Sequence, residues 1–395
     1  MLTNDCLLQN HISTLISLWR NTKNANFLSK PEILKVSSDL LSLQRGLTGK
    51  RELVGSGYME NPSQLGAYLL YYWPISYMQI YWAAKSCPEL IAAEKKEINI
   101  LDMGSGPAPA SVSLCDLLLK NGSQKISVDL CDFSQKALNL ATQIYSRDLK
   151  SVTIKTRVQN FEKDVPHSDK KYDIIIMSHA FNEIWKNSPD FIQKRTDFLI
   201  KLSENLVDDG ILFLSEPALL ETSRNLLQIR NRLIQNGFFI LSPCPGQSDC
   251  PALSAGPNHT CHAEISLAPV EPVSSIAKNA RLDRESVKMT YFIFKKGYKT
   301  VPMEEDSTAI KGKVVSDAML NKSGRIRFLI CNGKTRTAVS AKKDDPYAKK
   351  IKFFALKRYD SVLISNPEIR GDNETKAYGI KEDTELRVQK FLENH

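Results

Sequence analysis

The chain has 395 residues, of which 42% are hydrophobic and 25% are charged. This is the composition of a soluble globular protein large enough for two or three domains. The longest apolar stretch, residues 65–84, contains a proline and several polar side chains, which excludes a membrane span. The net charge of +9 comes from residues 310–358, where fourteen Lys or Arg stand against three Asp. Such a segment favours a polyanionic partner, most often nucleic acid, over an ordinary solvated surface.

Residues 1 to about 90 are expected to form a helical N-terminal region. Apolar residues recur every three or four positions in residues 7–18 and 33–43, which is the spacing of a buried helix face. Asn61-Pro62-Ser63 predicts a helix start, and the apolar stretch after it predicts two buried helices that meet at Pro74. The first residues lack both a basic apolar leader and an early arginine. We therefore expect no secretory signal or transit peptide, and a cytoplasmic, reducing location.

From residue 97 short apolar strands alternate with helices. This alternation predicts a parallel sheet covered on both faces. Together with the glycine loop and acidic residues described next, it leads us to expect a class I, Rossmann-like S-adenosylmethionine (SAM) methyltransferase fold. The cysteine-rich loop is expected to be an insertion between the last two strands. The predicted strands are 98–101, 125–130, 152–158, 172–177, 211–214, 238–241 and 287–296.

The glycine loop carries the first candidate site. Asp102, Gly104, Ser105 and Gly106 follow a strand and open a helix, where glycines allow a tight turn and the close approach of a ligand. Asp132 ends the next strand, 26 residues after Gly106, so its carboxylate is expected to accept both ribose hydroxyls of an adenosine cofactor. Because the third glycine of a dinucleotide motif is absent, SAM fits better than NAD. The alternative is a structural turn without a ligand.

Two further loops are expected at the same edge of the sheet. Asn160 and Phe161 follow the third strand and are candidates for the adenine side of the pocket, with an ordinary surface loop as the alternative. His179, Asn182 and Glu183 follow the fourth strand and would face the methyl group. His179 or Glu183 is a candidate base, although a histidine at a strand end is more often a structural hydrogen-bonding group.

Four cysteines predict a metal centre. Cys244, Cys250 and Cys261 lie in one proline-rich loop, and Cys331 lies far downstream. In a reducing compartment grouped thiols usually hold a metal or cluster. Proline after Cys244 and after Cys250 is a familiar accompaniment of iron–sulfur ligands. Zinc stays a competitor, through the three loop cysteines with either His262 or Cys331.

The last part of the chain predicts a small β-rich module. Strands are expected at 312–315, 324–331, 335–339 and 351–356, followed by a charged helix at 382–394. The expected domains are therefore a helical region 1–90, a SAM-binding domain 91–300 with a metal-cluster loop 242–285, and a basic module 301–395 with a C-terminal helix.

On these residues the chain resembles a known family, the methyltransferase-like assembly factors of the small ribosomal subunit. The family comprises mitochondrial Rsm-type proteins and bacterial relatives. The resemblance runs from about residue 58 to about residue 354, although Ala108 stands where such loops usually have a glycine. Its motifs are the glycine loop 101–111, the segment 178–184, the Glu216-Pro217 turn followed by Arg224, and the Cys-Pro loop 243–262 with Cys331.

The resemblance implies SAM binding, a 4Fe–4S cluster and a role on small-subunit rRNA during ribosome assembly. It makes Cys244, Cys250, Cys261 and Cys331 the cluster ligands and His262 a neighbour. We expect a monomer without membrane contact, in the bacterial cytoplasm or, in a eukaryote, the mitochondrial matrix. Whether it is an enzyme stays open: an rRNA methyltransferase is the first hypothesis, and a non-catalytic rRNA-binding factor is the second. A small-molecule methyltransferase with structural zinc is the third.

Overall fold

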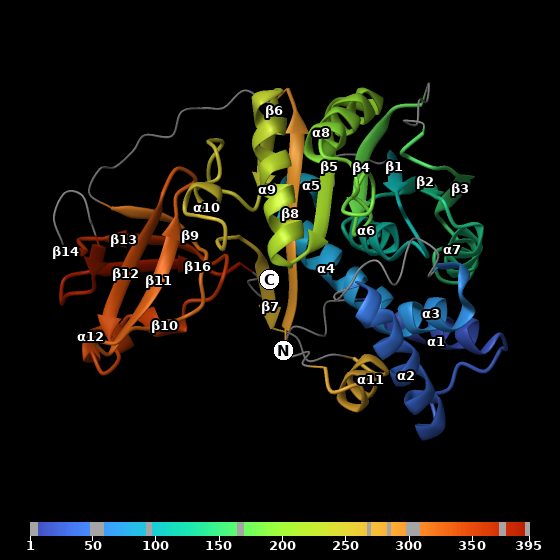
Figure 1. The fold of residues 1–395 in the computed structure, drawn as a ribbon, viewed down its shortest axis with the longest axis horizontal. Helices are drawn as coiled ribbons and strands as arrows, with labels where there is room; N and C mark the ends of the chain where they lie inside the picture. The colour runs from blue at the N-terminus through green and yellow to red at the C-terminus, as the bar shows by residue number, and fades with distance from the viewer. Residues whose placement is uncertain are drawn as a thin grey trace. The chain divides into compact units, whose positions relative to one another are not determined.

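The computed structural model describes residues 7–47, 59–91, 97–163, 170–266, 270–282, 286–297, 309–370 and 377–391 (Figure 1). The chain folds into two compact units. The first comprises Met1–Glu216 and Ile265–Met289, and the second comprises Pro217–Glu264 and Thr290–His395. Within the described ranges, no helix has the length and apolar character needed to cross a membrane.

The N-terminal region is helical, as the periodicity predicts. The predicted start at residues 61–63 is also present, because the Asn61 side chain accepts hydrogen bonds from the backbone N–H groups of Ser63 and Gln64, at 3.0 and 3.3 Å. Such a cap supplies acceptors for the first N–H groups of a helix. The helices are α1 (Leu8–Arg20), α2 (Lys30–Leu47), α3 (Pro62–Ala67), a π-helix (Tyr68–Tyr72), α4 (Trp73–Lys85) and α5 (Pro88–Ile91).

The apolar stretch 65–84 differs from the prediction in one respect. Instead of two helices meeting at Pro74, α3 continues through the π-helical turn Tyr68–Tyr72 directly into α4. Pro74 then stands in the first turn of α4, where a missing N–H costs least. Trp73 Nε1 donates to the backbone oxygen of Pro107 at 2.9 Å, which ties this helical segment to the glycine loop.

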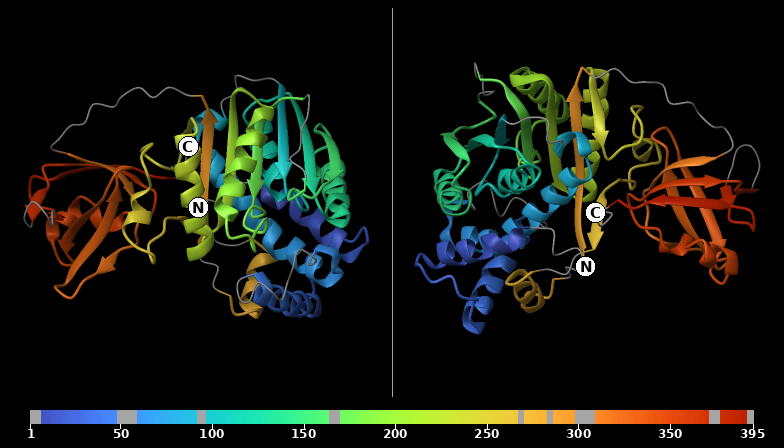
Figure 2. Two further views of the ribbon diagram at one scale, coloured as in Figure 1. Left: turned by 45° about the horizontal axis from the view of Figure 1, so that its top comes forward. Right: turned by 180° about the vertical axis from the view of Figure 1, so that it is seen from behind.

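The predicted parallel sheet is present. Its strand order is β3-β2-β1-β4-β5-β8-β6, in which β1 to β5 pair in parallel and β6 pairs antiparallel with β8. This is the class I SAM methyltransferase-like fold. Views from the front and the back show α8 on one face and α4 on the other (Figures 1 and 2). The elements are β1 (Glu97–Met103), α6 (Pro109–Lys120), β2 (Lys125–Asp132), α7 (Gln135–Asp148), β3 (Thr153–Val158), β4 (Tyr172–Ser178), α8 (Phe191–Leu202), a 3₁₀ turn (Ser203–Asn205), β5 (Leu206–Pro217), α9 (Leu220–Gln235), β6 (Phe238–Ser242), α10 (Pro251–Ser254), β7 (Ala263–Ser266), α11 (Val273–Asn279) and β8 (Ser286–Lys296).

The strand order creates a switch point between β1 and β4. From β1 the chain moves in one direction to β2 and β3, and in the other direction to β4 and β5. In open α/β sheets ligands bind outside the carboxyl ends of the strands at such a point. The carboxyl ends of β1, β2 and β4 are therefore where a cofactor is expected.

The C-terminal module is β-rich, in agreement with the fold prediction. Its second sheet has the order β14-β15-β12-β11-β9-β13-β16 and encloses a core that includes Phe328, Val339, Phe353 and Ile364. The elements are β9 (Ile310–Val314), β10 (Met319–Leu320), β11 (Arg325–Cys331), β12 (Arg336–Lys342), α12 (Pro346–Lys350), a 3₁₀ turn (Phe353–Ala355), β13 (Ser361–Ser365), β14 (Glu368–Arg370), β15 (Ala377–Gly379) and β16 (Glu385–Gln389).

Two predictions in this module are wrong. The expected strand 351–356 contains instead the 3₁₀ turn after α12. The expected C-terminal helix 382–394 contains strand β16, which pairs antiparallel with β13. Leu386 and Val388 of β16 pack on the module core. The alternation of apolar and polar residues therefore selects a strand, although the charged composition suggested a helix. Residues 392–394 of the expected helix lie outside the described part of the chain.

Within the first unit, a buried charge network joins the N-terminal helices α1 and α4 to α6 and α7, two helices that pack on the sheet. His11 of α1 donates from Nδ1 to Asp148 of α7 at 2.8 Å and from Nε2 to Asp116 of α6 at 2.7 Å. The Tyr77 hydroxyl of α4 donates to the same Asp116 carboxylate. Burial alone disfavours the imidazolium, but the hydrogen bonds to the two carboxylates outweigh it and raise the pKa of His11 to about 9.

The first unit should therefore lose stability as the pH rises. Since the folded-state pKa of His11 exceeds its unfolded value, its contribution is complete below about pH 6.5 and is lost as the pH passes about 9. The free energy of unfolding should fall by about 3 kcal/mol over this pH range. All four tryptophans lie in the first unit, so fluorescence-detected urea unfolding between about pH 6 and pH 10 measures it.

His11→Gln should be less stable than the wild type near pH 6 and should lose this pH dependence. His259→Gln, at an exposed position of the second unit, is the matched control and should keep it. The same slope in His11→Gln as in the wild type would contradict the assignment.

Candidate functional site

The glycine loop turns between the ends of β1 and β2. The N–H groups of Gly104 and Ser105 both donate to the backbone oxygen of Cys131, at 2.8 and 3.1 Å. Gly104 and Gly106 have φ values of +68° and +52°, a region that L side chains rarely adopt. Ala108 adopts it too, with φ of +61°, so the residue that stands in place of a usual glycine keeps the left-handed conformation.

Asp102 supports this loop from behind. Its carboxylate is 1% exposed and accepts hydrogen bonds from the Ser111 hydroxyl at 2.6 Å and from the Ser111 N–H at 3.3 Å. Burial raises the pKa of Asp102 to about 7, against the opposing effect of these bonds. These contacts show that Asp102 stabilises the first turn of α6. The motif alone did not reveal Ser111 as its hydrogen-bonding partner.

Asp132 lies at the end of β2 and faces the loop. One carboxylate oxygen accepts from the Gly106 N–H at 2.8 Å and the other accepts from the Ser134 N–H at 2.8 Å. Each oxygen can still accept a second hydrogen bond, so the carboxylate can also receive ribose hydroxyls. Burial raises the pKa of Asp132 despite these bonds.

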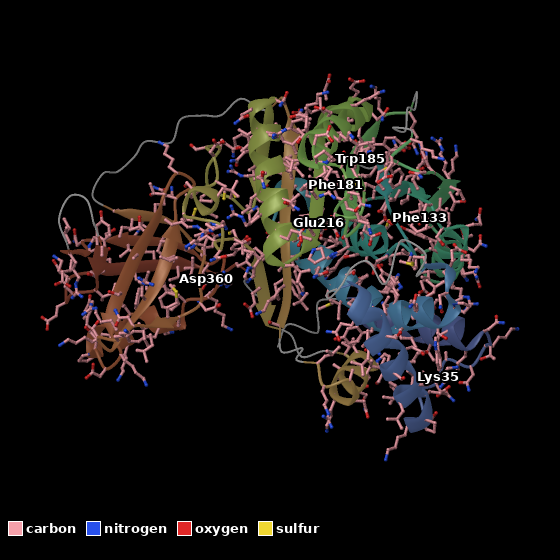
Figure 3. All side chains as sticks on the ribbon, in the orientation of Figure 1. Lys35, Phe133, Phe181, Trp185, Glu216 and Asp360 are labelled. Atoms are coloured by element: carbon pink, nitrogen blue, oxygen red, sulfur yellow. The ribbon has the colours of Figure 1, made fainter. Side chains whose placement is uncertain are left out.

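The loop after β4 packs directly on the glycine loop. A Cβ added at Gly104 would lie 2.2 Å from the Cβ of Ala180 and 3.8 Å from the Phe161 ring. The glycine loop, the loop after β3 and the loop after β4 therefore meet at one place, with Gly104 and Phe161 as the predicted site residues in this contact. Asn160 is exposed, and its side chain accepts from the Glu162 N–H at 2.9 Å. Phe133, 40% exposed beside Asp132, is an additional aromatic side chain at this edge (Figure 3).

His179 is held in one neutral form by a residue of the N-terminal region. The Gln79 amide donates from Nε2 to the backbone oxygen of Lys288 at 2.8 Å, so its Oε1 faces His179 Nε2 at 2.8 Å. Because Oε1 only accepts, the proton is on Nε2 and the Nδ1 lone pair stays available. Burial lowers the pKa of His179 to about 4, so the imidazole is neutral near pH 7. Its φ of +59° is strained.

The other candidates after β4 contact the end of β5. Asn182 donates from its N–H to Glu216 at 3.2 Å, and its side-chain amide donates to the same carboxylate. Burial raises the pKa of Glu216 to about 7, and the charge of Glu183 adds to that rise. Arg195 donates to the backbone oxygens of Asn182 and Ile184. Figure 3 shows Phe181, Trp185 and Glu216 in this region. Because Asn182 donates two hydrogen bonds to Glu216, it holds the loop after β4 against the end of β5.

The four predicted cysteines line one pocket of the second unit. Their segments approach closely, since a Cβ added at Gly333 would lie 2.5 Å from the Cα of Gly246. The Tyr359 hydroxyl is 3.4 Å from Cys261 Sγ. The charged side chains that also line the pocket are Arg230, Lys313 and Arg336. These contacts bring together thiols that are up to 87 residues apart in the chain.

The thiols do not stand in a ready-made metal geometry. In the part of the chain that the structure describes, no group of three or more His, Cys, Asp or Glu forms a metal site. All four cysteines are free. Burial raises the pKa of Cys244 to about 12 and that of Cys331 to about 11, so without a metal these thiols are neutral. A metal ion would have to draw them together as thiolates.

Comparison with known proteins identifies one family. The model of the family described as mitochondrial small ribosomal subunit Rsm22 matches residues 62–352, which is more than half of the chain. No curated protein matches this chain.

Solved structures share only a distant likeness with the chain. An rRNA methylase from Streptococcus thermophilus is 13% identical, with 55% of this chain and 94% of that chain covered and a TM-score of 0.30. A methyltransferase from Pyrococcus furiosus is 12% identical, with 52% and 77% covered and a TM-score of 0.32. The plantazolicin methyltransferase BpumL in complex with SAH is 10% identical, with 68% and 98% covered and a TM-score of 0.34. Likeness at this level carries no functional argument.

The contact between Gly104 and Ala180 can be tested by substitution. Gly104→Ala combines a strained φ with a steric clash and should destabilise the first unit by about 2–5 kcal/mol. Gly122→Ala is the matched control, because Gly122 has φ of +98° but no atom within 4 Å of an added Cβ. It should cost only about 1–2 kcal/mol. Fluorescence-detected urea unfolding measures both.

Ala180→Gly removes the atom that the new methyl group meets. The double variant Gly104→Ala/Ala180→Gly should therefore recover the difference between Gly104→Ala and Gly122→Ala. If Gly104→Ala and Gly122→Ala destabilised the first unit equally, the glycine loop and the loop after β4 would not pack as described.

Proposed function

We propose that this chain, which belongs to the Rsm22 family of mitochondrial small ribosomal subunit proteins, is a SAM-dependent methyltransferase acting on small-subunit rRNA during ribosome assembly. In a eukaryotic cell it would work in the mitochondrial matrix, and in a bacterium in the cytoplasm. The proposal joins three features: the loops at the switch point of the first sheet, the basic module and the four-cysteine pocket.

The observation that carries the proposal is the convergence of three loops at the carboxyl ends of β1, β2 and β4. Gly106 donates its N–H to Asp132, and Gly104 packs on Ala180. A side chain at Gly104 would meet Ala180, so a glycine is needed there for the two loops to pack this closely. The Asp132 carboxylate suits the ribose of a nucleoside bound over these loops. SAM, when bound, supplies an activated methyl group, so the main task of the protein is to position the acceptor.

The choice of rRNA rests on the family and on charge. Fourteen Lys or Arg in residues 310–358 belong to the second unit, whereas the SAM loops belong to the first. Basic side chains that neutralise phosphates give nucleic-acid affinity independent of sequence. The proposed division of labour is therefore RNA binding by the module and cofactor binding by the sheet.

The side chains after β4 favour a second candidate function, a non-catalytic rRNA-binding assembly factor. Asn182 is bonded to Glu216, and a His179 with a pKa of about 4 is a weak base near pH 7. Neither is arranged as a strong general base. In this alternative SAM binding would stabilise or signal a folded state instead of supplying a methyl group.

We further propose that Cys244, Cys250, Cys261 and Cys331 hold a 4Fe–4S cluster, with a zinc ion as the alternative. Two features of the pocket support an anionic metal centre. Four thiols line it, which is the ligand set of both groups. Among the described residues, the buried Nε atoms of Arg230 and Arg336 also lack a hydrogen-bond partner. His262 is not among the side chains that line the pocket, which favours Cys331 as the fourth ligand.

Methyl transfer can be tested with labelled SAM. Protein purified without oxygen should transfer label to small-subunit rRNA or to assembly intermediates.

Asp132→Asn should weaken SAM binding at least about tenfold, because the ribose would lose a charged acceptor. Asp129→Asn is a matched control on the same strand, where the native carboxylate pairs with Lys170 at 3.0 Å, and it should bind SAM normally. SAM binding without any transferred label would exclude the catalytic function and leave the assembly factor.

Metal content tests the centre separately. Wild-type protein purified without oxygen should contain about four irons with sulfide, whereas a single zinc would select the alternative. Cys331→Ser should lose the metal and weaken rRNA binding about tenfold while SAM binding is unchanged, because the ligand belongs to the second unit. Cys87→Ser removes a buried thiol of the first unit and should keep the metal. Equal loss of SAM and rRNA binding in Cys331→Ser would contradict the division of labour.

A further inference from the structure

We propose that Arg230 and Arg336 stabilise the four-cysteine centre by supplying positive charge and N–H hydrogen bonds to its sulfur atoms. The inference rests on the metal centre proposed above and assigns the residues that support it. Each arginine is associated with a different pair of cysteines, and together they account for all four.

Arg230 organises the segment between Cys244 and Cys250. It is 1% exposed on α9, and its Nη atoms donate to the backbone oxygens of Gly246, at 3.0 Å, and of Ser248. Both oxygens belong to the loop that joins the two cysteines. Arg230 thus carries a full charge into the interior, a costly arrangement unless an anion is nearby.

The neighbour of Arg230 fixes the same loop. The Asn231 side-chain oxygen accepts from Arg230 Nη1 at 2.7 Å and from the backbone N–H of Cys250 at 3.0 Å. In this way the position of Cys250 is linked to that of the guanidinium. The remaining donor, Arg230 Nε, is buried and has no partner among the described residues.

Arg336 has the corresponding place beside the other two cysteines. It begins β12, directly across from Cys331 of β11 in the antiparallel register. Its Nη2 donates to the backbone oxygen of Thr260 at 2.9 Å, the residue before Cys261. Its Nε is also buried without a partner in the described part of the chain.

Lys313, the third cation that lines the pocket, is already engaged. Its Nζ donates to the Ser361 hydroxyl at 3.1 Å. The two arginines are therefore the cations whose buried donors remain unused among the pocket side chains that the structure describes.

The chemistry of the centre matches these donors. Four thiolates carry more negative charge than a zinc ion or an iron–sulfur core neutralises, so the loaded site is anionic. Charge-assisted hydrogen bonds to its sulfur atoms would satisfy both Nε groups, and bonds to sulfur tune iron–sulfur centres.

The test is how long the protein keeps its metal. Wild type, Arg336→Gln and Arg336→Lys are purified without oxygen, and the release of iron or zinc to excess EDTA is followed by metal analysis and absorption. Arg336→Gln should release the metal about 10- to 100-fold faster, the usual effect of losing a group that supports a metal ligand. Arg336→Lys, which retains the charge, should recover most of the retention.

Arg336 is preferred to Arg230 for this test, because Arg230 also holds two loop carbonyls and its loss can disturb folding. Arg387→Gln is the matched control: it removes one positive charge from the same unit at a side chain that is 78% exposed. It should retain the metal as the wild type does. Circular dichroism verifies that each variant is folded.

Two outcomes separate this inference from the proposed centre. A metal-containing wild type with equal metal release from Arg336→Gln would overturn only the role of the arginines. A wild type that binds neither iron nor zinc under these conditions would overturn both the centre and the inference. For an iron-loaded protein, Arg336→Gln should also shift the reduction potential to more negative values, because the reduced centre is more negative and loses a nearby positive charge that stabilises it.

Discussion

The first unit depends on one constraint: each carboxylate taken out of water must receive its hydrogen bonds from the chain. Asp102 receives them from Ser111, Asp132 from Gly106 and Ser134, and Glu216 from Asn182. Because buried charges are costly when they are unpaired, these bonds fix the glycine loop and the loop after β4. The same acidic side chains that suggested chemistry in the sequence thus also determine the shape of the site.

Much of the fold was predictable because its signals are local. Buried parallel strands have short apolar runs, and the glycine loop has a recognisable strand–turn–helix context. Gln79 and Ser111 were not predictable as partners of His179 and Asp102, since only tertiary packing brings them together. The helix predicted at 382–394 was wrong for a related reason: charged composition suggested a helix, whereas burial of Leu386 and Val388 selected a strand.

For the candidate metal site, the sequence predicted the cysteines but not the side chains around them. Cysteine spacing and the proline after two of the thiols indicated a shared centre, and the structure brings the four cysteines to one pocket. Nothing in the spacing of Arg230 or Arg336 marks them as neighbours of that pocket. Their place beside the pocket follows from the register of β11 with β12 and from the face of α9 that is buried, both of which are properties of the folded unit.

The approach of Gly246 to Gly333 has a consequence for the timing of synthesis. Cys331 follows Cys261 by 70 residues, so three thiols leave the translating ribosome well before the fourth. At about 5–20 residues per second, the delay is roughly 4–14 s. During this interval Cys244, Cys250 and Cys261 are present without Cys331. If the four cysteines hold a metal as proposed, the centre can be completed only after the C-terminal module has been made.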